Sequence, residues 1–175
     1  MIFQHDHRVR PLIWLLTVTV VSCVGAQWVD FRSEEGGFMA TFPGTPTRET
    51  KTVNTAQGSR DMQMYGFTDK QTSFSVVVTE LPQEQVESVG PAATLDGARD
   101  GAVANTQGIL LGELIIQVSG HPGRELKIAT GGGKATIRAR LFLINNRLYQ
   151  ALVVTPADDS YAPSVRRFLE SVKFL

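Results

Sequence analysis

Four strand-like segments in the C-terminal half most strongly constrain the fold of this chain. Each is rich in apolar or β-branched residues, and only short polar breaks separate them. The segments are residues 109–119, 124–129, 134–144 and 147–155. Because short connections join antiparallel neighbours, this succession predicts a sheet of consecutive antiparallel strands.

The two asparagines at residues 145–146 predict the turn between the last two of these strands, because asparagine tolerates positive φ. A two-residue turn here pairs Leu143 with Leu148, and Phe142 with Tyr149. The first pair lies on one face of the sheet and the second on the other. Both faces are therefore apolar, and we expect the sheet to be covered on both sides.

The N-terminal half predicts further short strands before any helix. They are expected at residues 28–31, 38–42, 60–67 and 73–81, with the turn sequence Pro-Gly-Thr-Pro at 43–46 after the second. The segment 73–81 carries the β-branched residues that favour a pleated surface. We find no internal repeat, and residues 27–175 are predicted to form a single α+β domain.

A helix is predicted over residues 91–106, with proline near its start and small residues at helical spacing. Gly97 and Gly101 weaken this prediction, since glycine in a helix costs about 0.5 to 1 kcal/mol relative to alanine. A pair four residues apart suggests close packing against the sheet. The alternative is a flexible lid.

A second, amphipathic helix is predicted over residues 160–171, with Asp159 or Ser160 as N-cap. Its apolar stripe consists of Tyr161, Val165, Phe168 and Leu169, and its charged residues lie off that stripe. Residues 172–175 are expected to return as a short terminal strand.

Residues 1–26 have the three parts of an export signal in order. Arg8 and Arg10 form a positive region, residues 11–21 a short apolar region, and residues 24–26 end in small residues. The apolar run is shorter than the ~20 residues that a membrane-spanning helix needs. The sequence thus predicts an exported protein, periplasmic or extracellular.

Cys23, the only cysteine, leaves two interpretations open. The preceding residues 20–22 are two aliphatics and a serine, which also fits the loose pattern of a bacterial lipoprotein cleavage site. Cys23 would then be lipidated and would anchor the protein; otherwise it is removed with the leader. In both cases we expect no disulfide in the domain, which hydrophobic burial must stabilise.

Composition argues against one broad class of partner. The chain has 17 basic and 17 acidic residues among 175, so no global field favours nucleic acid. No run of lysine and arginine supplies a local phosphate-binding patch either. We predict no nucleic-acid partner.

The sequence patterns that could indicate catalysis each lack residues that the chemistry requires. The glycine-rich segment 130–136 lacks the first glycine and the hydroxyl residue of a phosphate-binding loop, so a hairpin turn is the better interpretation. The nucleophile-elbow pattern is absent. A hydrolytic constellation of Ser119, His121 and Asp96 or Asp100 is geometrically conceivable, but Ser119 lacks the strained turn that exposes a nucleophile.

Metal binding is also not indicated. Zinc sites use clustered histidine and cysteine, and past the leader only His121 is left. Asp158 and Asp159 lack the alternating oxygen ligands and central glycine of a calcium loop, so helix capping explains them more simply. We predict no metal, no cofactor and no enzymatic activity.

One binding hypothesis follows from the predicted register, which places Arg138, Arg140, Phe142 and Tyr149 on a single sheet face. Arginine and aromatic groups together bind anionic or planar ligands through bidentate hydrogen bonds and stacking. The simpler interpretation is that the aromatics pack beneath a helix while the arginine stems extend along it to solvent.

His121 lies in the segment Ser-Gly-His-Pro-Gly-Arg-Glu, which looks at first like an active-site loop. We predict instead that the strand breaks at Gly120, that residues 122–123 supply the turn, and that the next strand begins at Arg124. Arg124 and Glu125 then point to opposite faces of that strand.

Four short sequence segments occur together and in order. They are Phe-Met-Ala-Thr-Phe-Pro-Gly at 38–44, Gly-His-Pro-Gly-Arg-Glu at 120–125, Asn-Arg-Leu-Tyr at 146–149 and Phe-Leu-Glu-Ser-Val-Lys-Phe at 168–174. With these segments the chain resembles small exported bacterial proteins with a PsbP-like or Mog-like α/β/α sandwich. The resemblance implies an antiparallel sheet with helices on both sides, in a superfamily better known for docking to larger assemblies than for catalysis. Fold likeness alone transfers no specific role.

These observations favour a non-catalytic binding or scaffolding domain at the cell envelope, acting through protein–protein docking with an unknown partner. The alternatives are an exported carrier of a small or anionic ligand and, less favoured, a small hydrolase. A flat exposed apolar patch would indicate docking, and a deep pocket with convergent polar groups a carrier.

Overall fold

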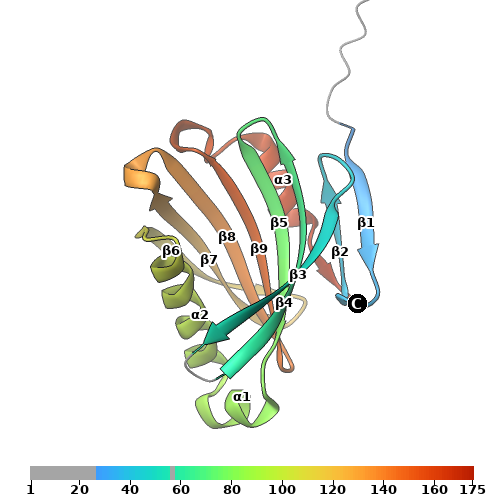
Figure 1. The fold of residues 1–175 in the computed structure, drawn as a ribbon, viewed down its shortest axis with the longest axis vertical. Helices are drawn as coiled ribbons and strands as arrows, with labels where there is room; N and C mark the ends of the chain where they lie inside the picture. The colour runs from blue at the N-terminus through green and yellow to red at the C-terminus, as the bar shows by residue number, and fades with distance from the viewer. Residues whose placement is uncertain (1–26, 56–57) are drawn as a thin grey trace, which may run out of the picture.

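The computed structural model describes residues 27–55 and 58–175, which form two antiparallel sheets and three α-helices (Figure 1). The larger sheet has seven strands in the order β3-β4-β5-β9-β8-β7-β6. In chain order these are β3 (Thr47–Thr55), β4 (Gly58–Asp69), β5 (Thr72–Glu80), β6 (Ile109–Val118), β7 (His121–Thr130), β8 (Ala135–Ile144) and β9 (Arg147–Pro156). The smaller sheet consists of β1 (Val29–Ser33), β2 (Phe38–Phe42) and β10 (Lys173–Phe174) in the order β1-β2-β10.

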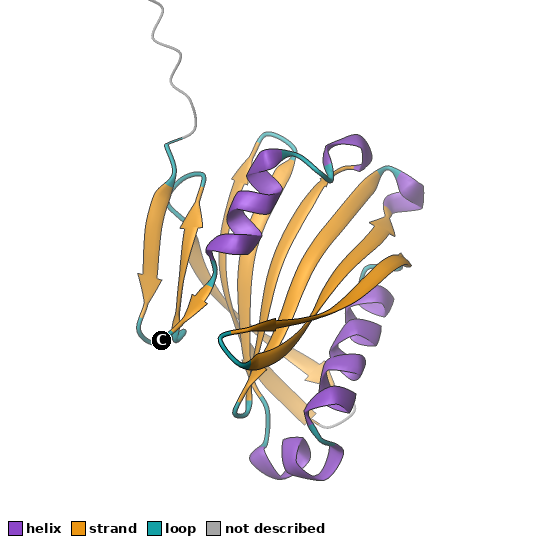
Figure 2. Ribbon diagram, turned by 180° about the vertical axis from the view of Figure 1, so that it is seen from behind, coloured by secondary structure: helices purple, strands orange, loops and turns teal. Residues whose placement is uncertain are grey.

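The two faces of the large sheet are covered differently. Helices α1 (Gln83–Val89) and α2 (Pro91–Asn105) lie on one face, and α2 packs on β7 and β8. Helix α3 (Pro163–Ser171) and the small sheet lie on the other, as the opposite views of Figures 1 and 2 show. The predicted α+β class, an antiparallel sheet with helices on both sides, is confirmed.

Each face has its own core. Beneath α3 and the small sheet the core is rich in aromatic rings, including Phe42, Phe74 and Phe168. Beneath α2 it is aliphatic, built around Leu95 and the strand residues that face it. Because side chains alternate between the two faces along β8 and β9, these two strands contribute residues to both cores.

The β8–β9 hairpin has the predicted register. Leu143 pairs with Leu148 and Phe142 with Tyr149, and the turn residue Asn145 has φ of 55°. The glycine-rich segment is likewise a turn, between β7 and β8, with positive φ at each glycine of Gly131–Gly133.

The prediction for the β6–β7 connection was wrong in its position. The turn residues are Ser119 and Gly120, with φ of 52° and 83°, and Val118 pairs with His121. Pro122 and Gly123 lie inside β7. Gly123 is needed there because a Cβ at this position would come within 2.6 Å of the Leu141 carbonyl oxygen and of the Phe142 ring.

The predicted role of the α2 glycines was also wrong. A Cβ built on Gly97 or Gly101 meets no atom within 4 Å, so neither glycine permits a close approach to the sheet. The helix itself, at Pro91–Asn105, agrees with the prediction.

Helix α3 starts later than predicted. Pro163 occupies its first turn, where a missing N–H costs nothing, and the N-cap is Ala162 without a side-chain hydrogen bond. Asp159 belongs to a preceding 3₁₀ turn, Ala157–Asp159. Tyr161 therefore lies outside the helix and is 73% exposed, whereas the rest of the predicted stripe is buried.

Two elements had no sequence prediction. Strand β3 has the polar sequence Thr-Arg-Glu-Thr-Lys-Thr-Val-Asn-Thr, which has no apolar alternation because the strand lies at a sheet edge. Helix α1 is a short seven-residue segment. The terminal strand does form, as β10, and it pairs with β2 of the small sheet.

The predicted leader and Cys23 lie outside the described residues. Within residues 27–55 and 58–175, no helix combines the length and the hydropathy needed to cross a membrane.

Candidate functional site

Arg138 and Arg140 face the α3 side of the sheet and share one carboxylate. Glu125 on β7 accepts a hydrogen bond of 2.5 Å from Arg138 Nη2 and one of 2.7 Å from Arg140 Nε. The side chains of all three are 20% exposed or less. Arg140 also donates to the Leu169 carbonyl oxygen at the end of α3, at 3.3 Å.

The pKa of Glu125 reflects this arrangement. Burial raises the pKa, but hydrogen bonds and attraction from Arg140 and Arg138 outweigh it, so that the pKa is lowered overall. The carboxylate is therefore ionised at neutral pH. It already occupies the bidentate position that an anionic ligand would take on these two arginines.

Phe142 and Tyr149 share the sheet face of the arginines, as predicted, but not their surroundings. Both are buried, and both pack against Phe174 of β10. The ring centroid of Phe174 lies 5.2 Å from that of Phe142 and 4.8 Å from that of Tyr149. The cover over them is thus the terminal strand, not a helix.

The arginines border a different space. A cavity of about 380 Å³ lies between them and the start of α3, with Tyr161 and Arg166 on its rim. The guanidinium of Arg138 lies 5.1 Å from the centre of the Tyr161 ring. The four predicted residues thus divide into a charged pair at a cavity and an aromatic pair in the core.

The residues of the hydrolytic hypothesis do not come together. His121 packs edge-on against Phe174, and within the described residues it has no hydrogen bond to a hydroxyl or a carboxylate. Asp96 is an ion-pair partner of Arg99 and Arg124, and Asp100 of Arg99. In the part of the chain that the structure describes, no three metal-ligating side chains gather into a cluster.

An exposed apolar strand lies at one edge of the large sheet. Strand β6 pairs with β7 on one side and has no strand on its other side in the described chain. Its large aliphatic side chains reach into solvent on both faces: the exposed fraction is 80% for Ile115 and 64% for Leu114. The others are Ile109, Leu110 and Leu111. We refer to these five side chains as the β6 edge.

Ion pairs hold this strand to α2. Glu113 of β6 accepts from Arg99 Nη1 at 3.0 Å and pairs with Arg124 Nε at 3.1 Å. Arg124 is itself buried and also binds Asp96 of α2 at 3.1 Å. The apolar side chains are therefore presented by an anchored strand.

Sequence reasoning placed this strand but missed its exposure. The segment Ile-Leu-Leu-Gly-Glu-Leu-Ile-Ile-Gln-Val is apolar at both parities, which is also typical of a strand buried on both faces. Only the strand order places it at an edge. One available signal was that a single helix, at 91–106, precedes it and cannot cover every strand.

No protein-family model matches the chain, and no curated protein matches it significantly. Among solved structures, the chain is similar to the cyanobacterial PsbP protein, CyanoP, of Synechocystis, with a TM-score of 0.60 and 14% identity. The match covers 91% of this chain and 99% of CyanoP. The chain has a PsbP-like fold. It also matches the protein of unknown function PA94 from Pseudomonas aeruginosa at a TM-score of 0.39 and 16% identity, over 67% of this chain and 87% of that one.

Proposed function

We propose that the chain is a non-catalytic docking domain that binds an extended segment of another protein along the β6 edge. The observation that carries this proposal is the coincidence of an unpaired strand edge with exposed aliphatic side chains on both of its faces. An extended segment forms main-chain hydrogen bonds with such an edge, while its side chains contact those of the strand.

The opposite edge of the same sheet supports this interpretation. Natural proteins protect their edge strands with charged side chains, and β3 does so with Arg48, Glu49 and Lys51, each exposed. On β6 the corresponding charge is Glu113, which is already paired with two arginines. The molecule thus protects one edge against strand addition and leaves the other open.

The edge also indicates the chemistry of the partner. Leu114 points to the α3 face and Ile115 to the α2 face, since their partners on β7 are Glu125 and Arg124. A segment added beside them needs apolar side chains at successive positions, because alternate residues contact the two faces of β6. We therefore commit to an extended, uncharged, apolar segment of a partner protein.

The leader predicted at residues 1–26 supports placing this docking at the cell envelope, in the periplasm or outside the cell. If Cys23 is lipidated, the anchor holds the domain at a membrane, where a membrane-associated partner is within reach. Cleavage at the same leader without lipidation would leave a freely diffusing docking domain.

Site-specific photo-crosslinking tests the proposal. A photoreactive phenylalanine analogue replaces Ile115 in the full chain, expressed in its native host, and the crosslinked peptide is sequenced by mass spectrometry. The expected result is one adduct to an extended apolar segment of a different protein. Adducts only to a second copy of this chain, or no adduct, would show that the edge does not serve this purpose.

Three comparisons make the test specific. The same analogue at Thr50 of β3 reports the protected edge, and we expect at least tenfold less adduct there. Leu114→Lys should abolish the adduct at position 115 by placing a charge in the interface. Val89→Lys, at another exposed apolar residue on α1, should leave it unchanged. Equal labelling from both edges would overturn the proposal.

A further inference from the structure

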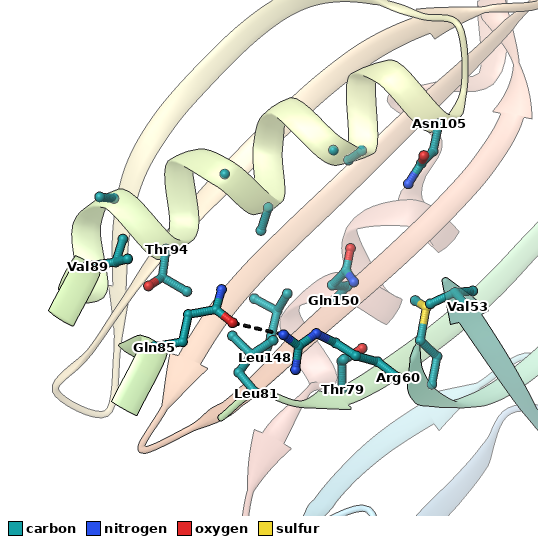
Figure 3. Close-up of a pocket in the computed structure, with 16 residues that line it drawn as sticks. Val53, Arg60, Thr79, Leu81, Gln85, Val89, Thr94, Asn105, Leu148 and Gln150 are labelled. Atoms are coloured by element: carbon teal, nitrogen blue, oxygen red, sulfur yellow. Dashed lines mark hydrogen bonds between the residues drawn. The ribbon is translucent and has the colours of Figure 1, made fainter. Parts of the chain in front are cut away.

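A second site lies on the α2 face, far along the sheet from the β6 edge. A groove of about 450 Å³ runs between α1 and α2 on one side and β4, β5 and β9 on the other (Figure 3). Its volume falls within the range of about 300 to 1,000 Å³ that small-molecule sites occupy. Most of its surface is apolar.

The α2 side of the groove includes a row of four residues at a spacing of four, of which the first three are small. Ala93, Gly97, Gly101 and Asn105 line it, so the groove follows the helix for twelve residues, roughly 18 Å at about 1.5 Å per residue. A Cβ at either glycine would enter empty space. The missing side chains of these glycines leave the elongated groove open, and no other group of the described residues packs into the space.

The side of the groove opposite α2, formed by the sheet, is apolar. Met62 of β4, Leu81 after β5 and Leu148 of β9 line it, with Val53 near one end. Leu148 is buried in the α2-side core, so the groove is continuous with that core. An alkyl chain placed along α2 would contact aliphatic groups over its whole length.

A buried hydroxyl in this wall has no partner. Thr79 lines the groove and is 6% exposed, and its Oγ1 has no hydrogen-bond partner within the described residues. Nearly all buried polar groups in proteins are hydrogen-bonded, so a group left unpaired in the wall of a groove points to a bound molecule that completes it.

A cation lines the same groove. Arg60 of β4 is two residues before Met62, which pairs with Thr79 across the β4–β5 ladder. Its Nη2 donates to Gln85 Oε1 of α1 at 2.9 Å (Figure 3). No carboxylate of the described chain lies within ion-pair distance of Arg60, unlike the guanidinium groups of Arg138 and Arg140. The arginine retains donors for an anion in the groove.

We infer that this groove binds an elongated amphipathic carboxylate, a straight-chain fatty acid or a ligand of the same chemistry. Its carboxylate accepts hydrogen bonds from Arg60 and Thr79, and its alkyl chain lies beneath the small residues of α2. This site is independent of the docking proposed at the β6 edge, and either can fail without the other. It gives the carrier hypothesis a location different from the predicted arginine face.

Isothermal titration calorimetry with dodecanoate, below its micellar concentration, tests this inference on the full chain. We expect one bound dodecanoate per chain. Dodecanol, which has the chain without the charge, should bind at least tenfold more weakly, and acetate should not bind. Equal affinity for dodecanoate and dodecanol would overturn the assignment of the anion site.

Variants locate the binding. Gly101→Leu fills the groove and should weaken dodecanoate at least tenfold. Ala104→Leu adds the same side chain at an exposed position of the same helix and should leave the affinity within twofold. Unchanged binding by a folded Gly101→Leu protein, verified by circular dichroism, would show that dodecanoate binds elsewhere, for example to the leader.

Two polar variants separate the head group from the chain and do not depend on filling the groove. Arg60→Gln should weaken dodecanoate at least tenfold and leave dodecanol unchanged. Thr79→Val preserves the shape of the side chain; it should weaken dodecanoate severalfold and raise the melting temperature of the free protein, because it removes an unpaired buried hydroxyl. A lower melting temperature for Thr79→Val would contradict the inference that this hydroxyl is unpaired in the free protein and binds a ligand.

Discussion

The two faces of the seven-stranded sheet are built from the same strands but differ in how completely they are closed. On one face, α3 and the three-stranded sheet enclose interlocking aromatic rings. On the other, α1 and α2 cover an aliphatic core and leave a groove beside it. The difference suggests that the aromatic face supplies stability and the α2 face keeps room for binding.

The aromatic face should show the largest response to truncation. Phe168 of α3 is fully buried, with ring centroids 5.0 Å from Phe42 and 5.5 Å from Phe74. Phe168→Ala removes these contacts and leaves a cavity that the surrounding rings cannot fill. We expect a loss of about 4 kcal/mol in the free energy of unfolding, measured by urea denaturation.

Leu95→Ala on α2 is the matched truncation on the other face. Leu95 is also fully buried, but the helix that carries it lies beside an open groove, so we expect α2 to adjust to the smaller side chain more readily than the packed rings do. We expect a loss of about 3 kcal/mol, smaller than that of Phe168→Ala. A larger loss for Leu95→Ala would reverse the proposed division between the faces.

The charged pair on the closed face gives a pH-dependent comparison. Glu125→Gln leaves Arg138 and Arg140 without their carboxylate, and we expect a loss of about 2 kcal/mol at pH 7. Because the pKa of Glu125 is lowered in the folded protein, its contribution is complete above the ordinary value of 4.5 and decreases as pH falls below it.

Urea denaturation of wild type and Glu125→Gln at several pH values measures this effect. The difference between the two proteins should be constant near neutrality and should shrink between pH 4.5 and lower pH. A difference that does not change with pH would mean that Glu125 acts through packing alone.

The residues that sequence reasoning placed correctly are those whose patterns are local. The asparagine turn fixed the β8–β9 register, and alternation assigned Phe142 and Leu143 to opposite cores. The predicted position of the β6–β7 turn was wrong because a Pro-Gly pair is a strong turn signal. In the structure Gly123 lies inside a strand, where the Phe142 ring leaves no room for a Cβ.

The sites were harder to predict because they depend on tertiary position. Ile115 belongs to a correctly predicted strand, but its exposure follows from the strand order. Thr79 belongs to another, and only the three-dimensional structure shows that its hydroxyl has no hydrogen-bond partner among the described residues. Gly97 and Gly101 were noticed in the sequence, yet the same spacing indicates close packing or an open channel, and only the structure distinguishes them.

The smallest effect bears on those glycines and should have the opposite sign from the others. Gly101→Ala adds a methyl group where no atom lies within 4 Å and removes the entropic cost of glycine in a helix. We expect a gain of about 0.5 to 1 kcal/mol in the free energy of unfolding. A glycine kept for close packing would give a loss instead, so a measured gain would show that the chain retains Gly101 at the expense of stability. That result would make the open channel, and not the packing of α2, the reason for a glycine at this position.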